Sequence, residues 1–332
     1  MLIQRILLPL ALFLGFVGLR AEDQPQSYVR MEAAKDGSRA LQTAWRKLEP
    51  PKDSGKPVVW LIGVCHVGEK SYYEKTQRKL DAAELVLFEG IGFDGKEAED
   101  RNKSESKVSS LQTTLAQSLG LVFQLDAIEY DRRHFRNSDL GVAELQAKLI
   151  GSANKAKPGK KENDPQLRAF MKMLEGDSFA LTLVQGILKL FQGNPQFRAM
   201  ARLVIIETIA ASGGDVSKLA ASASPAMRRL FKTLIDDRNA VVVRDLRKTM
   251  RGKDAPAEVA IFYGAGHMTD LEARLSRKLG YQPAGETWVT VFSVNPKKAG
   301  LSEFETALVA RMIKSQLAKL QQGGSTPKQK NR

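Results

Sequence analysis

The chain has 332 residues, with 51 Lys and Arg against 37 Asp and Glu, and a formal net charge of +14. Its hydrophobic share of 43% is too high for a disordered chain and too low for a protein that crosses a membrane many times. The single cysteine, Cys65, excludes an intrachain disulfide framework and cysteine-rich zinc or iron–sulfur sites. The three histidines, His66, His134 and His267, are therefore the only imidazoles available as metal ligands or bases.

Residues 1–21 have the pattern of a secretory signal peptide. Arg5 supplies the positive charge, residues 6–19 form a short apolar run, and small residues near Ala21 provide a cleavage site. The run is short for a membrane-spanning helix, although an uncleaved anchor is the alternative. The sequence therefore predicts export to the periplasm or the cell exterior, with residues 22–39 as an exposed leader.

Positive charge gathers in residues 155–161 and in the C-terminal tail, residues 321–332, which we expect to be disordered. Neither segment contains a nucleic-acid-binding module or interleaved aromatic residues. Nucleic acid is therefore not an expected partner, whereas a weak attraction to an anionic membrane surface fits the charge.

The first predicted elements form a strand–helix–strand unit. Residues 58–62 are a continuous run of apolar, mostly β-branched residues, which is typical of a strand buried on both faces. A helix over 71–83 and a second apolar strand over 85–88 follow. Before this unit, residues 40–48 fit either a strand or a short helix, and the Pro- and Gly-rich residues 50–57 form a loop.

The remaining elements place helices in the middle of the chain and a second strand–helix–strand near its end. Helices dominate residues 141–250, interrupted by a basic loop over 151–165. The other predictions, in chain order, are a loop over 92–106, a helix over 110–119, a helix over 226–250, a strand over 259–263, a helix over 269–279, a strand over 288–294 and a helix over 301–320. Together they predict one α/β domain over residues 40–320.

Two segments of the chain share one pattern. Residues 58–66 (VVWLIGVCH) and 259–267 (VAIFYGAGH) each contain an apolar strand, a glycine, two small or modest residues and a histidine. Open α/β sheets place ligand sites at the carboxyl ends of their strands, so His66 and His267 are expected at such an edge. Glu89 ends a third predicted strand, and the glycines are expected to let the backbone turn sharply.

Two imidazoles and one carboxylate suit two kinds of chemistry. They can bind a divalent ion such as Mn, Co or Zn while leaving room for a water molecule, or a histidine can activate water directly. The alternative for each is structural: a histidine with satisfied hydrogen bonds, or a salt bridge of Glu89 or Arg238. Cys65 does not suit a dyad with His66, because neighbours on a strand point to opposite faces.

These residues resemble the GxxH-motif proteins of the TraB/GumN/TIKI superfamily. The resemblance rests on residues 63–90 with the first GxxH block and Glu89, residues 124–130 and 137–140, Asp237-Arg238-Asn239, and residues 263–275 with the second GxxH block. The Lys-rich stretch 151–165 and the C-terminal helix and tail depart from the family's pattern.

The resemblance implies a fold and a function. The fold is EreA/ChaN-like, with a mixed β-sheet, flanking helices and a large helical insertion. The implied function is that of an exported hydrolase, a metal-dependent peptidase for peptide or amide bonds. His66, Glu89 and His267 would bind the metal, and Arg238 would stabilise an oxyanion. Gln124, Tyr130 and Asp139 would bind substrate. The alternative is a non-catalytic protein that sequesters a peptide or haem in the same cleft.

Overall fold

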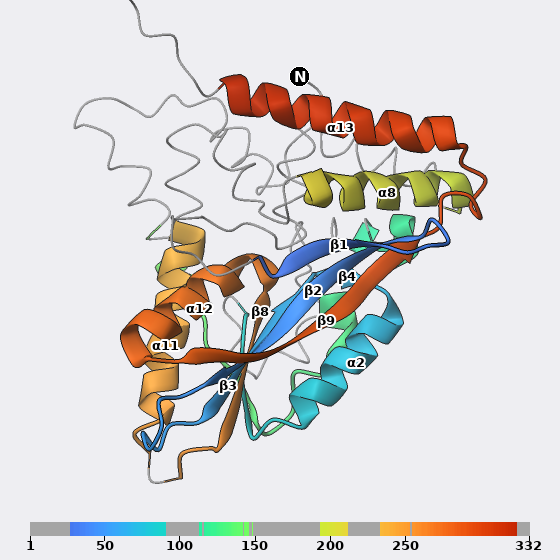
Figure 1. Cartoon of the computed structure of the whole chain (residues 1–332). Helices are drawn as coiled ribbons and strands as arrows, with labels where there is room; N and C mark the ends of the chain where they lie inside the picture. Colours follow the sequence, from blue (N-terminus) through green and yellow to red (C-terminus); the bar gives the residue numbers. More distant parts are fainter. Residues whose placement is uncertain are drawn as a thin grey trace, which may run out of the picture.

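The structure is a computed structural model that describes residues 27–90, 113–141 without 115, 143–145 and 148, 193–211, and 233–323 without 253. The predicted signal peptide, the loop over 92–106, the basic loop over 151–165 and residues 324–332 lie outside this part of the chain. The described residues form a mixed α/β fold in which helices flank one β-sheet (Figure 1). The predicted α/β class is thus confirmed.

Four parallel strands carry the centre of the sheet. They are β3 (Val58–Val64), β8 (Glu258–Gly264), β5 (Leu85–Phe88) and β7 (Phe135–Asn137), in that spatial order. Three of them follow from their apolar runs and extend the predicted strands by at most two residues. The fourth strand, β7, was not predicted. It is a short strand at the edge of the sheet, and its residues Phe-Arg-Asn have no apolar pattern.

The antiparallel part of the sheet is built around one long strand, β2 (Arg39–Glu49). Its first half pairs with β1 (Val29–Ala33), its second half pairs with β3, and β9 (Gln282–Val294) pairs with its whole length. The prediction of an exposed leader over 22–39 is corrected for residues 29–33, which form β1. The alternation in Val-Arg-Met-Glu-Ala gives this edge strand one polar face, which conceals it in the sequence.

The helices cover both faces of the central sheet (Figure 1). On one side lie α11 (Arg238–Thr249) and α12 (Ala265–Leu279), which contact each other, and on the other side lies α2 (Lys70–Asp81). Beyond β1, α8 (Pro195–Ala211) packs against α13 (Glu303–Gly323). A short π-helix, η1 (Thr233–Asp237), leads directly into α11. No helix within the described residues is long and apolar enough to cross a membrane.

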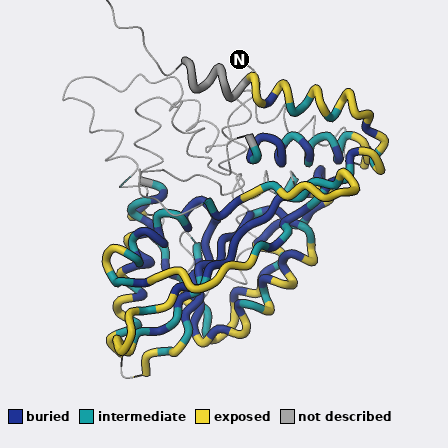
Figure 2. The backbone as a smooth tube through the Cα atoms, in the orientation of Figure 1, coloured by how far each residue is buried: buried dark blue, intermediate teal, exposed yellow. Residues whose placement is uncertain are grey.

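The core is continuous through the central strands, which Figure 2 shows as buried, whereas β1 and the first half of β9 are largely exposed. A buried polar cluster ties β2 to α12. Arg46 Nη1 donates a hydrogen bond to Glu272 Oε2 at 2.9 Å, and the Tyr28 hydroxyl donates to the same oxygen at 2.6 Å. Since all three side chains are buried, this cluster fixes α12 against the antiparallel part of the sheet.

Candidate functional site

Three neighbouring parallel strands end at the same edge of the sheet, and each end carries one of the predicted site residues. In the register, Val64 of β3 lies beside Gly264 of β8, and Phe88 of β5 lies beside Phe262 of β8. His66 therefore follows β3, His267 follows β8 and Glu89 follows β5. The prediction that these segments meet at one sheet edge is confirmed for the strands.

The two GxxH segments differ in local structure although their letters agree. After β3 the chain bends at His66 and continues into the short strand β4 (Val67–Gly68), whereas after β8 it enters α12, so that His267 lies in the first turn of a helix. The β-branched Val64 and Val67 favour the extended path, and Ala265 and Met268 favour the helix.

The motif glycines do not act as sharp turns. The φ angle of Gly264 is −49°, and Gly63 is absent from the residues with positive φ. A Cβ atom on Gly63 would instead lie 3.2 Å from the Ala44 carbonyl oxygen and 3.4 Å from the Cα atom of Ala265. Gly63 is therefore needed for the close approach of β2, β3 and the start of α12.

Arg238, the first residue of α11, joins two carboxylates. Its Nη2 donates to Glu89 Oε1 and to Asp139 Oδ2, each at 2.6 Å, and its Nε donates to Asp139 Oδ1 at 2.9 Å. The exposed fractions of these side chains are 8% for Arg238, 13% for Glu89 and 0% for Asp139. The bidentate contact with Asp139 holds the guanidinium in one orientation, so only its Nη1 hydrogens remain for another group.

The environment keeps Glu89 charged. Burial by itself raises the pKa of Glu89, but the charge of Arg238, the electrostatic interactions with the two imidazoles and the hydrogen bond from the Gly264 N–H together bring that pKa far below its usual value. The Gly264 N–H to Oε2 distance is 2.6 Å, and this N–H stands at the N-terminus of α12, where negative charge is favoured. For Arg238, burial lowers the pKa, but Glu89 and Asp139 raise it well above its usual value.

His267 is buried and neutral. Its Nδ1 lies 2.8 Å from Asn239 Oδ1, while Asn239 Nδ2 donates to the His267 carbonyl and to Asp270. Because the Asn239 amide nitrogen is already used as the donor, we assign the imidazole proton to Nδ1. Burial is the largest of the causes that lower the pKa of His267 to about 4, against the raising effect of Glu89. The unprotonated Nε2 then faces Arg238 Nη1 at 3.4 Å.

His66 is held in a parallel way on the other side of the site. Its Nδ1 lies 2.8 Å from Gln124 Oε1, and Gln124 Nε2 donates to the Tyr130 hydroxyl at 2.7 Å. The same argument assigns the proton of His66 to Nδ1 and leaves Nε2 as an acceptor. His66 is half-buried and interacts electrostatically with both Glu89 and His267. Each GxxH histidine is thus oriented by one side-chain amide.

The short β4 strand brings Gln124 to this place. It pairs with β6 (Val122–Phe123), and the next residue begins the short helix α4 (Gln124–Ala127). The Gln124 N–H donates to the His66 carbonyl at 2.8 Å, so backbone and side chain of Gln124 both bind the same residue.

The three predicted metal ligands do not fit a divalent ion in this arrangement. Zinc needs ligand atoms at about 2.0–2.2 Å, but Glu89 gives one oxygen to Arg238 and the other to Gly264. His267 Nε2 is 3.7 Å from Glu89 Oε1, with the guanidinium beside both. Within the described ranges, no group of three or more His, Cys, Asp or Glu side chains is placed to bind a metal. Arg238 is the cation that the carboxylates bind here.

The structure therefore brings the seven predicted site residues into two linked groups. One contains Glu89, Asp139, Arg238 and His267, and the other contains His66, Gln124 and Tyr130. Asn239, which orients the His267 ring, had no predicted role. Its only signal in the sequence is its position next to Arg238. The π-helical turn η1 directly before Arg238 has no signal in the sequence, although such turns occur frequently at functional sites.

Cys65 and His134 have no part in this network. Burial raises the pKa of the Cys65 thiol to about 12, so it is not a thiolate near neutral pH. His134 lies beyond the opposite end of β5, where its Nε2 is 3.2 Å from the Leu80 carbonyl oxygen.

Comparison with known proteins adds no relative from which the roles of these residues could be inferred. No family model matches the chain, and no curated protein or solved structure matches it either.

Proposed function

We propose that this chain is a hydrolase of peptide or amide bonds in which His66 activates the attacking water. The single observation that carries the proposal is the pair of imidazoles at one sheet edge, each held with Nδ1 at 2.8 Å from an amide oxygen, an arrangement that assigns the acceptor role to Nε2. An acceptor nitrogen fixed beside a buried carboxylate is the arrangement that general-base catalysis needs. The resemblance to TraB/GumN/TIKI proteins and an EreA/ChaN-like fold is part of this proposal, as is export.

The two histidines have different roles in the proposed reaction. His66 is the more exposed of the two, and its Nε2 takes a proton from water while the water oxygen attacks the substrate carbonyl. The imidazolium that forms is stabilised by the negative charge of Glu89, with which His66 already interacts. His267, whose pKa burial lowers to about 4, stays neutral and serves as an acceptor that orients water or substrate.

The remaining charges support this step. Arg238 offers its Nη1 hydrogens to the oxyanion, while its other donors bind Glu89 and Asp139. When the tetrahedral intermediate collapses, the carbon–nitrogen bond breaks and the proton on His66 passes to the leaving amine. The substrate-binding role of Gln124 is replaced in this proposal by a positioning role toward His66.

The test is hydrolysis of a mixed peptide library by the purified chain, with the products read by mass spectrometry. His66→Ala should lower the rate by about 10²–10⁴-fold. Lys75→Ala, an exposed substitution on α2, is the control and should leave the rate unchanged. Gln124→Leu should lower the rate constant kcat more than it raises KM, because it frees the imidazole without removing it.

Two outcomes would overturn the proposal. Cleavage by His66→Ala at the wild-type rate would remove His66 from the reaction. Recovery of a tightly bound peptide in intact form, with no cleavage by any variant, would favour the alternative of a protein that sequesters its ligand. A visible haem absorption band that is lost in the His66 variant would point to haem as that ligand.

A further inference from the structure

A basic pocket lies at the far ends of the two helices that carry the site. Its volume is about 430 Å³, and it is lined by Ala240, Val243, Arg244, Arg247, Lys248, Arg251 and Lys278. Arg238 and His267 stand in the first turns of α11 and α12, whereas Arg247 and Lys278 stand in their last turns. A helix rises 1.5 Å per residue, so Arg247 and Lys278 lie roughly 15 Å along their helices from Arg238 and His267, although the lining begins at Ala240, two residues after Arg238. The pocket is thus separate from the proposed catalytic residues.

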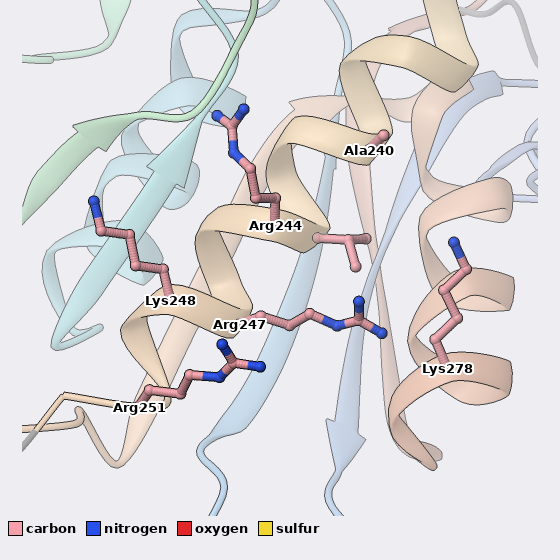
Figure 3. Close-up of a pocket in the computed structure, with 7 residues that line it drawn as sticks. Ala240, Arg244, Arg247, Lys248, Arg251 and Lys278 are labelled. Carbon is pink, nitrogen blue, oxygen red and sulfur yellow. The ribbon is translucent and has the colours of Figure 1, made fainter.

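The lining contains five cationic side chains and no carboxylate. Figure 3 shows Arg247 extending from α11 toward Lys278 on α12, while Arg244 and Lys248 extend from α11 on its other side. Among the described residues, Arg244 pairs with Asp245 at 3.0 Å, and no carboxylate forms an ion pair with Arg247, Lys248, Arg251 or Lys278. Like charges around one hollow repel one another, and a bound anion relieves that repulsion.

The helix dipole explains only part of this cluster. The partial negative charge at a helix C-terminus favours cations in the last turn, which accounts for Arg247, Lys248 and Lys278. It does not account for Arg244 in the middle of α11 or for Arg251 beyond its end. Guanidinium groups form two parallel hydrogen bonds with phosphate or carboxylate, and three of the five cations are arginines.

We propose that this pocket binds an anion that carries more than one phosphate group. Its volume is within the range of small-molecule sites, and its buried floor residue Val243 offers an apolar contact for the rest of the ligand. The phosphates can belong to a soluble phosphate ester or to a lipid headgroup, since both present the same chemistry. This inference does not depend on the proposed hydrolase activity.

The test measures binding of inorganic pyrophosphate to the full chain by calorimetry. Arg247→Gln/Lys278→Gln removes the two cations that approach each other from α11 and α12. Arg78→Gln/Lys75→Gln removes the same charge from exposed positions of α2 and is the matched control. The wild type and the control should bind equally, and the pocket variant should bind at least about tenfold more weakly. Because all four side chains are exposed, both variants should keep the wild-type circular dichroism spectrum.

A second arm identifies the source of the phosphates. Vesicles of phosphatidylinositol bisphosphate, a lipid whose headgroup carries several phosphates, in phosphatidylcholine are sedimented with each protein. A loss of vesicle binding in the pocket variant alone assigns the pocket to a lipid headgroup, and equal vesicle binding by both variants assigns it to a soluble phosphate. The proposal is overturned if wild-type protein shows no saturable pyrophosphate binding, or if the control loses as much affinity as the pocket variant.

Discussion

Replacing Arg238 with methionine tests the electrostatic core of the candidate site. The substitution keeps most of the side-chain volume but removes three hydrogen bonds of 2.6–2.9 Å to carboxylates that are at most 13% exposed. Breaking a buried ion pair by removing one partner costs about 3–5 kcal/mol, because the other charge stays buried. For a chain of this size, with an unfolding entropy of about 2.1 cal/mol/K per residue, that corresponds to a fall of about 4–7 °C in melting temperature.

The loss of stability in Arg238→Met should depend on pH. In the wild type, the pKa of Glu89 is below its usual value of 4.5, so the stability it contributes is complete above that value and is lost as the pH falls through the lower folded pKa. In Arg238→Met, Glu89 stays buried but loses the positive charge that lowered its pKa. The pKa of Glu89 in the folded state therefore rises. The deficit of the variant is then greatest at neutral pH and shrinks as the pH falls through the raised pKa.

Urea unfolding at pH 7 and pH 5, followed by tryptophan fluorescence, measures both effects. Arg244→Met is the matched control, since it removes another arginine–aspartate pair from the same helix at a side chain that is 67% exposed. Exposed pairs contribute about 0–1 kcal/mol, so this control should stay near the wild type at both pH values. An Arg238→Met variant within 1 kcal/mol of its control at pH 7 would refute the reasoning.

Three further predictions concern metal, the thiol and backbone packing. Chelation with EDTA should leave the melting temperature unchanged; a stoichiometric Mn, Co or Zn ion whose removal lowers it by several degrees would show that a metal replaces Arg238 as the counter-ion. Cys65, with a thiol pKa of about 12, should react with a thiol reagent only after denaturant unfolds the chain, and rapid labelling of the native protein would contradict its burial. Gly63→Ala should lower the free energy of unfolding by about 1–3 kcal/mol through its contact with the Ala44 carbonyl, whereas Gly285→Ala, with its nearest neighbour 3.8 Å away, should be neutral; equal urea midpoints for the two would remove the packing argument.

The sequence was sufficient for three of the four parallel strands, and not for the short edge strand β7. β3, β5 and β8 are buried on both faces, so their continuous apolar runs stand out without an alternating pattern. The repeated GxxH pattern further predicted that His66 and His267 stand at the carboxyl ends of strands, at the edge of the sheet where ligand sites occur. It could not show that one copy continues as extended chain and the other starts a helix, because that choice depends on packing beyond the motif.

The contacts inside the site were beyond the sequence for a different reason. Arg238 is followed along the chain by Asn239, but their partners Glu89, Asp139 and His267 are 28 to 149 residues away. Spacing along the chain carries no information about such pairs. An arginine that follows two aspartates, Asp236 and Asp237, also looks like part of a surface ion pair, and only the tertiary structure shows that it is buried.

Side chains at two separate places on α12 bind the rest of the molecule, and this limits how far the helix can move relative to the sheet. His267 in its first turn belongs to the hydrogen-bond network of the candidate site, and Glu272, little more than one turn later, is bound to Arg46 and Tyr28. Sliding α12 aside would break the second attachment together with the first. The segment around His66 is less firmly held, because β4 and β6 pair through only two residue pairs. Any movement of the site that makes room for ligands of different size is therefore expected there and not at α12.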